Sequence, residues 1–208
     1  GIFDEIPDLY GFGVNTLLGG GATLDLDFRD GSAFSTRGIR LFVQHDSYYN
    51  LSGEGQDVFG NTAALLSWYG TAKIALPVTL ALTAGYADTY GKVPFFKLNT
   101  LGRNHYLRGY FRNRFSGNTA AHFNGELRFH LGSIATPVVP LNVGLIGFYD
   151  QGRVWIDGAE NEAATWHNAY GGGFYLSPLS REFTFRFDVA WSDEQSLYFQ
   201  FGVGLFLR

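Results

Sequence analysis

Apolar and polar residues alternate along most of this chain, which is the pattern of β-strands that have one apolar and one polar face. Near the C-terminus, Phe183, Phe185 and Phe187 share one face. Thr184 and Arg186 share the other face. The same alternation predicts ten strands, at residues 9–17, 21–29, 37–47, 61–74, 77–90, 118–131, 140–155, 166–176, 181–192 and 196–207.

The lengths of these strands indicate a membrane protein. They run to about 9 to 14 residues, which is enough for a tilted strand to cross hydrocarbon. Longer connections at 48–60, 91–117 and 156–165 alternate with short turns, as in outer-membrane barrels. Aromatic residues near strand ends fit interfacial girdles, as at Trp68, Tyr86 and Trp191. We therefore predict one domain over 1–208, an all-β, transmembrane antiparallel β-barrel, rather than a soluble β-sandwich.

Composition supports this class and excludes others. Aromatic residues make up 17% of the chain and charged residues 16%, against a usual charged share of ~25%. The longest apolar stretch, Ile74 to Ala87, is shorter than the ~18 residues that a membrane helix needs. The absence of cysteine excludes a disulfide framework, a zinc–cysteine cluster and a thiol nucleophile. A net charge of −4 gives no support to nucleic-acid binding.

Candidate catalytic and metal-binding patterns are weak. Asp25 and Asp27 share one strand face about 7 Å apart, which suits acid–base chemistry but also a hydrated polar lumen. His122, Glu126 and His130 also share a face, but each step spans ~13 Å, so they cannot bind one metal. We predict no catalytic residue, no metal and no cofactor. The polar faces of the strands predict salt bridges in the lumen between arginines and acidic residues. The arginines are Arg40, Arg128 and Arg186, and the acidic residues are Asp188, Glu182 and Asp150.

Several motifs occur in an order that is similar to a known family. A strand ending in Arg29-Asp30 is followed by Thr36-Arg37-Gly38. A loop then carries Leu107-Arg108-Gly109-Tyr110, and two strands follow with Glu126-Leu127-Arg128-Phe129 and Asp150-Gln151-Gly152. The C-terminus has a polar residue, glycine and two alternating hydrophobics, which are Gln200, Gly202, Leu205 and Leu207. Over residues 20–208 the chain resembles the C-terminal barrel of BamA/TamA-like outer-membrane proteins, the bacterial surface antigen superfamily.

The resemblance has consequences for both site and function. It implies that Arg108 reaches into the lumen and pairs with Glu126 and Asp150, so that the loop at 91–117 is locked inside. It implies the second half of a sixteen-stranded barrel, in the bacterial outer membrane, that helps to insert or translocate other proteins without bond chemistry. The expected partners are outer-membrane lipid, lipopolysaccharide, client proteins and other assembly subunits. Arg112-Asn113-Arg114-Phe115 and Trp166-His167 look most like a subgroup fused to a metallophosphoesterase.

Two alternatives remain open at this point. The first alternative is a passive pore, or an anchor or exporter for a fused soluble domain such as a phosphoesterase. The other alternative is a membrane-embedded hydrolase that uses Asp25, Asp27 or a histidine.

Overall fold

The structure is a computed structural model that describes residues 15–52, 57–102, 106–137, 139–157, 165–178, 181–194 and 196–203. Nine strands form one antiparallel sheet in the order β1-β2-β3-β4-β7-β8-β9-β10-β11. Their bounds are β1 Leu17–Asp27, β2 Gly38–Asn50, β3 Val58–Lys73, β4 Pro77–Gly91, β7 Thr119–Ile134, β8 Leu141–Trp155, β9 His167–Pro178, β10 Phe185–Ser192 and β11 Tyr198–Val203. This confirms the all-β, antiparallel prediction.

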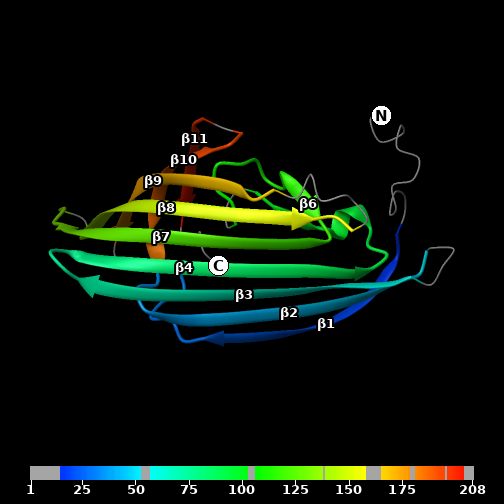
Figure 1. Cartoon of the computed structure of the whole chain (residues 1–208). Coiled ribbons are helices and arrows are strands. Elements are labelled where there is room, and N and C mark those ends of the chain that lie inside the picture. Colours follow the sequence, from blue (N-terminus) through cyan, green and yellow to red (C-terminus); the bar gives the residue numbers. More distant parts are fainter. Residues whose placement is uncertain are drawn as a thin grey trace.

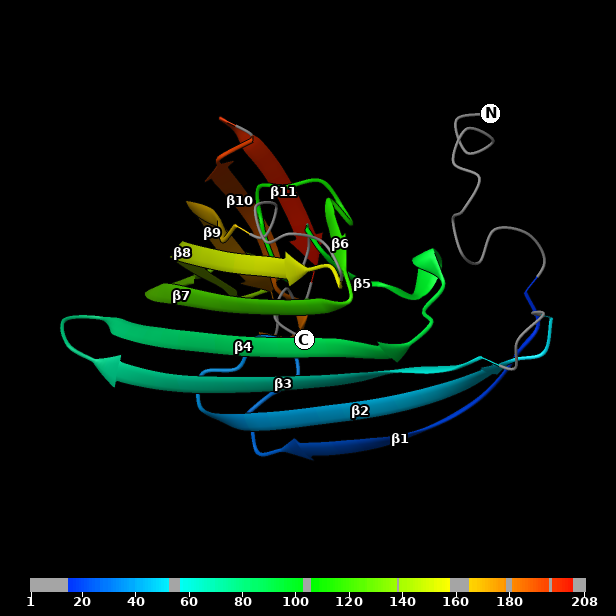
Figure 2. The same cartoon turned by 45° about the vertical axis from the view of Figure 1, so that its right-hand side comes forward.

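The sheet is a strongly curled barrel wall. Strands β1 to β4 form a broad layer, and the sheet then curls through β7 and β8 so that β9 to β11 stand over it (Figures 1 and 2). Within the described residues β1 pairs only with β2 and β11 only with β10, so the wall is open along these two edges. No helix among those residues has the length and apolarity to cross a membrane.

The start of the sheet differs from the prediction. The predicted strand at 9–17 lies mostly outside the described residues, and the predicted gap at 18–20 is wrong because β1 runs straight through it. Two of the three glycines there, Gly19 and Gly21, leave space for neighbouring side chains rather than forming a turn. A Cβ at Gly19 would collide with the Tyr48 ring, and one at Gly21 with the Asp46 carboxylate.

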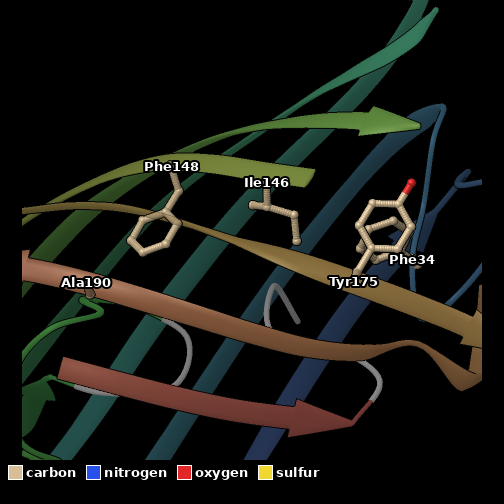
Figure 3. Packing of buried hydrophobic residues seen from close by; sticks show 5 residues of the cluster. All are labelled: Phe34, Ile146, Phe148, Tyr175 and Ala190. Carbon is tan, nitrogen blue, oxygen red and sulfur yellow. The ribbon is translucent and has the colours of Figure 1, made fainter. Parts of the chain in front are cut away.

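The two faces of the wall follow the alternation read from the sequence. Phe174, Phe187 and Phe201 pack side by side across β9, β10 and β11 on the outward face. The first two rings are stacked at 4.8 Å between centroids, and Phe201 is tilted against Phe187 at 4.9 Å. All three rings remain exposed, as expected for a lipid-facing surface. The inward face carries a buried apolar cluster (Figure 3), which consists of Phe34, Ile146, Phe148, Tyr175 and Ala190.

The connection between β4 and β7 has structure of its own. It contains a short 3-10 helix, η2 (Phe95–Lys97), and a two-stranded sheet that pairs β5 (Asn99–Leu101) with β6 (Phe115–Gly117). A second 3-10 helix, η4 (Arg181–Phe183), precedes β10. The prediction had treated 91–117 as a plain loop. Three-residue strands are too short to show a clear alternation, so their pairing was not visible in the sequence.

Candidate functional site

The tip of the loop between β4 and β7 is buried against the inner wall. Leu107 and Tyr110 have no exposed surface, and Arg108 is 2% exposed. Gly109 adopts a φ of +81°, a conformation that L side chains rarely take. Its carbonyl oxygen accepts a hydrogen bond of 2.8 Å from the Ser192 hydroxyl on β10. The tight turn at Gly109 therefore brings Arg108 and Tyr110 onto the wall together.

Arg108 makes a bidentate ion pair with Asp150. Its Nε and Nη2 donate to the two carboxylate oxygens at 2.6 and 2.7 Å, and its backbone N–H donates to the same group at 3.1 Å. Its Nη1 donates to Glu126 at 2.7 Å. The guanidinium carbon also lies 3.6 Å from the centroid of the Phe148 ring. Burial alone would lower the pKa of Arg108, but Asp150 and Glu126 outweigh it and raise that pKa.

Glu126 is the centre of a larger cluster. Besides Arg108, it accepts hydrogen bonds from Arg128 Nε at 2.6 Å and from Arg186 Nη1 and Nη2 at 3.1 and 2.9 Å. Arg186 Nη2 also donates to Asp188 at 2.9 Å. Three guanidinium groups thus face three carboxylates, and all six residues are buried. We call this set the interior ion network, which comprises Arg108, Glu126, Arg128, Asp150, Arg186 and Asp188.

Tyr110 fixes the other side of the loop tip. Its hydroxyl donates to the Asn168 carbonyl oxygen on β9 at 2.9 Å, and its ring meets Phe115 edge-on at 5.3 Å. Burial and the nearby Asp193 carboxylate raise the pKa of Tyr110 to about 12, so the hydroxyl stays protonated as a donor. The small inward residue Ala169 packs beneath it. The loop tip is therefore held by β7, β8, β9 and β10 at once.

The structure brings Leu107, Arg108, Gly109 and Tyr110 together with Glu126 and Asp150. The C-terminal pattern lies apart from this site, on β11. The side chain of Gln200 is buried there opposite Asp188, and no hydrogen-bond partner lies within the described residues. Gly202 is on the same strand, and Leu205 and Leu207 fall outside the described residues.

The predicted salt bridges in the lumen are partly wrong. Arg186 pairs with the predicted partner Asp188, while Arg128 pairs with Glu126 two residues earlier on its own strand. The side chain of Glu182 lies outside the described part of the structure. Arg40 pairs with Asp25 on β1 at 2.7 Å. Alternation places these side chains on the inward face, but the choice of partner depends on how strongly the sheet curls.

Within the described residues, the acidic and histidine side chains that the hydrolase alternative names have other contacts. Asp25 and Asp27 are each hydrogen-bonded to an arginine, from Arg40 and Arg29 respectively. Nowhere in the described part of the chain do three or more histidine or acidic side chains gather as a metal site would require. His122 instead packs against the Tyr106 ring, with centroids 4.3 Å apart.

A curled antiparallel wall, an apolar outward face and a loop held inside define an outer-membrane β-barrel protein. The chain belongs to the Omp85 superfamily, whose domain model matches residues 9–207. Members of this superfamily are outer-membrane proteins. Among curated proteins, none matches the chain. The match does not distinguish subgroups, so the likeness to metallophosphoesterase-fused members stays a prediction.

Proposed function

We propose that this chain is the barrel of a non-enzymatic assembly factor of the bacterial outer membrane, which helps to insert or translocate outer-membrane or surface proteins. The observation that carries the proposal is the loop tip seated on the interior ion network, with Arg108 bound to both Glu126 and Asp150 at 2.6–2.7 Å. Burying charges is expensive. A passive anchor has no use for a costly buried ion network. A barrel that must keep its interior in one defined state does have such a use.

The heights of the strands support a role in which clients enter from the membrane. β3 and β7 have 16 residues each, but β10 has 8. At ~3.4 Å per residue and a tilt of ~45°, the wall falls from about 38 Å to about 19 Å, below the ~25 Å apolar band of such barrels. A short wall near the C-terminal edge favours local thinning of the bilayer. We expect client strands, lipid and lipopolysaccharide to meet this edge.

Reconstitution tests the proposal directly. The full-length protein in liposomes should accelerate the folding of a urea-unfolded outer-membrane barrel relative to protein-free liposomes. Arg108→Ala should reduce this acceleration, while Arg114→Ala, which breaks an exposed pair with Glu194 on the same side of the barrel, should not. Equal folding rates with and without the protein would contradict an assembly role.

A passive pore or a membrane anchor for a fused soluble domain is the second candidate. It is favoured by a cavity of about 690 Å³ beside the loop, lined by residues that include Arg40, Leu65, Leu101 and Tyr106. The loop therefore does not fill the interior on the side of β1 to β4. Planar-bilayer recordings separate the candidates, since a pore conducts steadily, whereas a barrel locked by its loop conducts poorly until Arg108 is replaced.

A further inference from the structure

The tip of the turn between β1 and β2, at 33–35 within residues 28–37, is buried in a way that surface turns are not. Phe34 is 3% exposed and Ser35 is 1% exposed. Because neighbouring strands are antiparallel, this turn lies at the opposite end of the sheet from the loop that follows β4. Segments of the chain therefore enter the interior from both ends of the sheet.

The turn reaches the far wall of the curled sheet. The centroids of the Phe34 ring and the Tyr175 ring on β9 are 4.7 Å apart. The two side chains lie together in Figure 3. Arg181, just before β10, donates to Asp30 at 3.0 Å and to the Thr36 hydroxyl at 2.9 Å. In the sheet, β2 and β9 are separated by β3, β4, β7 and β8. These contacts cross the interior and brace one side of the wall against the other.

The turn also has a fixed internal shape. Asp30 accepts hydrogen bonds from the Thr36 N–H at 2.7 Å, the Thr36 hydroxyl at 2.5 Å and the Arg37 N–H at 3.1 Å. Burial works to raise the pKa of Asp30, but the bonds from Thr36, Arg37 and Arg181 outweigh it and lower that pKa to about 2. Thr71 on β3 donates to the Thr36 carbonyl oxygen at 2.8 Å. Phe34 and Ser35 are thus presented on a rigid base.

Arg128 connects this turn to the interior ion network. Its Nη1 donates to the Ser35 carbonyl oxygen at 2.8 Å, and its guanidinium carbon lies 4.1 Å from the Phe34 ring centroid. Its Nε holds Glu126 Oε1, while Arg108 holds Glu126 Oε2. A continuous chain of contacts therefore runs from the turn through Arg128 and Glu126 to the loop.

We propose that the β1–β2 turn is a second insert whose Phe34 and Ser35 position Arg128, and through it Glu126, to receive Arg108. The inference deepens the proposed function, since it names the residues that prepare the site for the loop. An arginine has a fixed planar fork, so clamping one side of the guanidinium sets the direction of its remaining donors. Without the turn, Arg128 loses the Ser35 carbonyl and the Phe34 ring and keeps only Glu126 and the more distant Tyr69 ring, so its hold on Glu126 is less fixed.

Distance measurements between spin labels test this in the folded barrel. The chain has no cysteine of its own, so two introduced cysteines carry the spin labels. They are Arg112→Cys in the loop and Val58→Cys on the outward face of β3. The unaltered chain should give one main distance. Phe34→Ala should add a second population with the loop displaced. The ratio of displaced to seated loop should rise by up to about thirtyfold, the factor expected from losing one buried cation–π contact.

Two further variants distinguish positioning from general destabilisation. Phe34→Tyr keeps an aromatic ring over Arg128 and should restore the single distance. Ile39→Ala removes an outward apolar side chain from β2 and should leave the loop seated. Resistance to heat on gels confirms that each barrel is folded. A folded Phe34→Ala barrel with an unchanged distance overturns the proposal, and so does loop displacement by Ile39→Ala of equal size.

The coupling is tested by combining changes. Phe34→Ala and Arg128→Gln act on one chain of contacts, so the double variant should displace the loop no more than the stronger single variant. Additive displacement would overturn the inference. All of these readouts concern the loop alone, so they stand whether or not the protein accelerates client folding.

Discussion

Replacing Arg108 with alanine strands one particular carboxylate. Asp150 has no exposed side-chain surface, and its side chain would keep a single hydrogen bond, from the backbone N–H of residue 108. Glu126, in contrast, keeps two ion-pair partners, Arg128 and Arg186. Leaving one buried charge without its partner costs roughly 3–5 kcal/mol. We expect the free energy of unfolding to fall by about that amount.

The same geometry predicts how the change combines with Asp150→Ala. Asp150→Ala alone should cost less than Arg108→Ala, because Arg108 keeps its bond to Glu126. The double variant should be no less stable than Arg108→Ala, since no carboxylate is then stranded. The assay is urea unfolding in lipid vesicles, followed by the gel mobility difference between folded and unfolded barrel.

An exposed ion pair supplies the control. Arg114 and Glu194 have side-chain exposures of 48% and 30%, so solvent screens this pair and Arg114→Ala should cost far less stability than Arg108→Ala. Two results would refute the reasoning. The first is a loss for Arg108→Ala as small as that for Arg114→Ala, and the second is strictly additive losses in the double variant.

Three more outcomes follow from the same contacts. Glu126→Gln should destabilise the barrel more than Asp150→Asn in the same urea assay, because Glu126 compensates three arginines and Asp150 one. Gly109→Ala should unseat the loop, since φ is +81° and a Cβ would lie 3.3 Å from Ala190 and Ser192. Unseating exposes the otherwise buried Arg108, so trypsin should then cleave after it, and mass spectrometry detects the cleavage. Asp30 has a depressed pKa in the folded state, so its contribution is present above its unfolded pKa of ~3.9 and lost as pH falls towards about 2. The stability difference between the unaltered chain and Asp30→Asn, measured across that window, should therefore vanish at the acid end.

Much of the wall follows from the sequence because each strand is decided locally. The alternation of apolar and polar residues in β3, β4, β7 and β10 needs no knowledge of the neighbouring strand. It also places Glu126, Arg128 and Asp150 on the inward face. The glycines at 19–21 misled the prediction because glycine serves two purposes: it permits turns, and it leaves room for a large neighbour such as Tyr48.

The contents of the interior were harder to predict, for a physical reason. Whether Arg128 meets Glu126, Asp150 or the Ser35 carbonyl depends on the curl of the whole sheet and on which segments enter it. The loop motif is recognisable in the sequence because it combines arginine, glycine and tyrosine. The turn at 28–37 contains two phenylalanines among polar and small residues, and no alternation shows that Phe34 is buried while Phe28 is exposed.

The ladder between β4 and β7 separates the loop from the wall. Asp88 pairs in register with Thr119, so the two ends of the loop are joined at its base by the sheet itself. The loop can therefore leave the interior without breaking hydrogen bonds between those strands, and its return requires only a short search by a segment with tethered ends. Departure of the loop therefore breaks the ion pairs of Arg108 but leaves the β4–β7 ladder intact. The interior can open while the strand pairing of the wall persists.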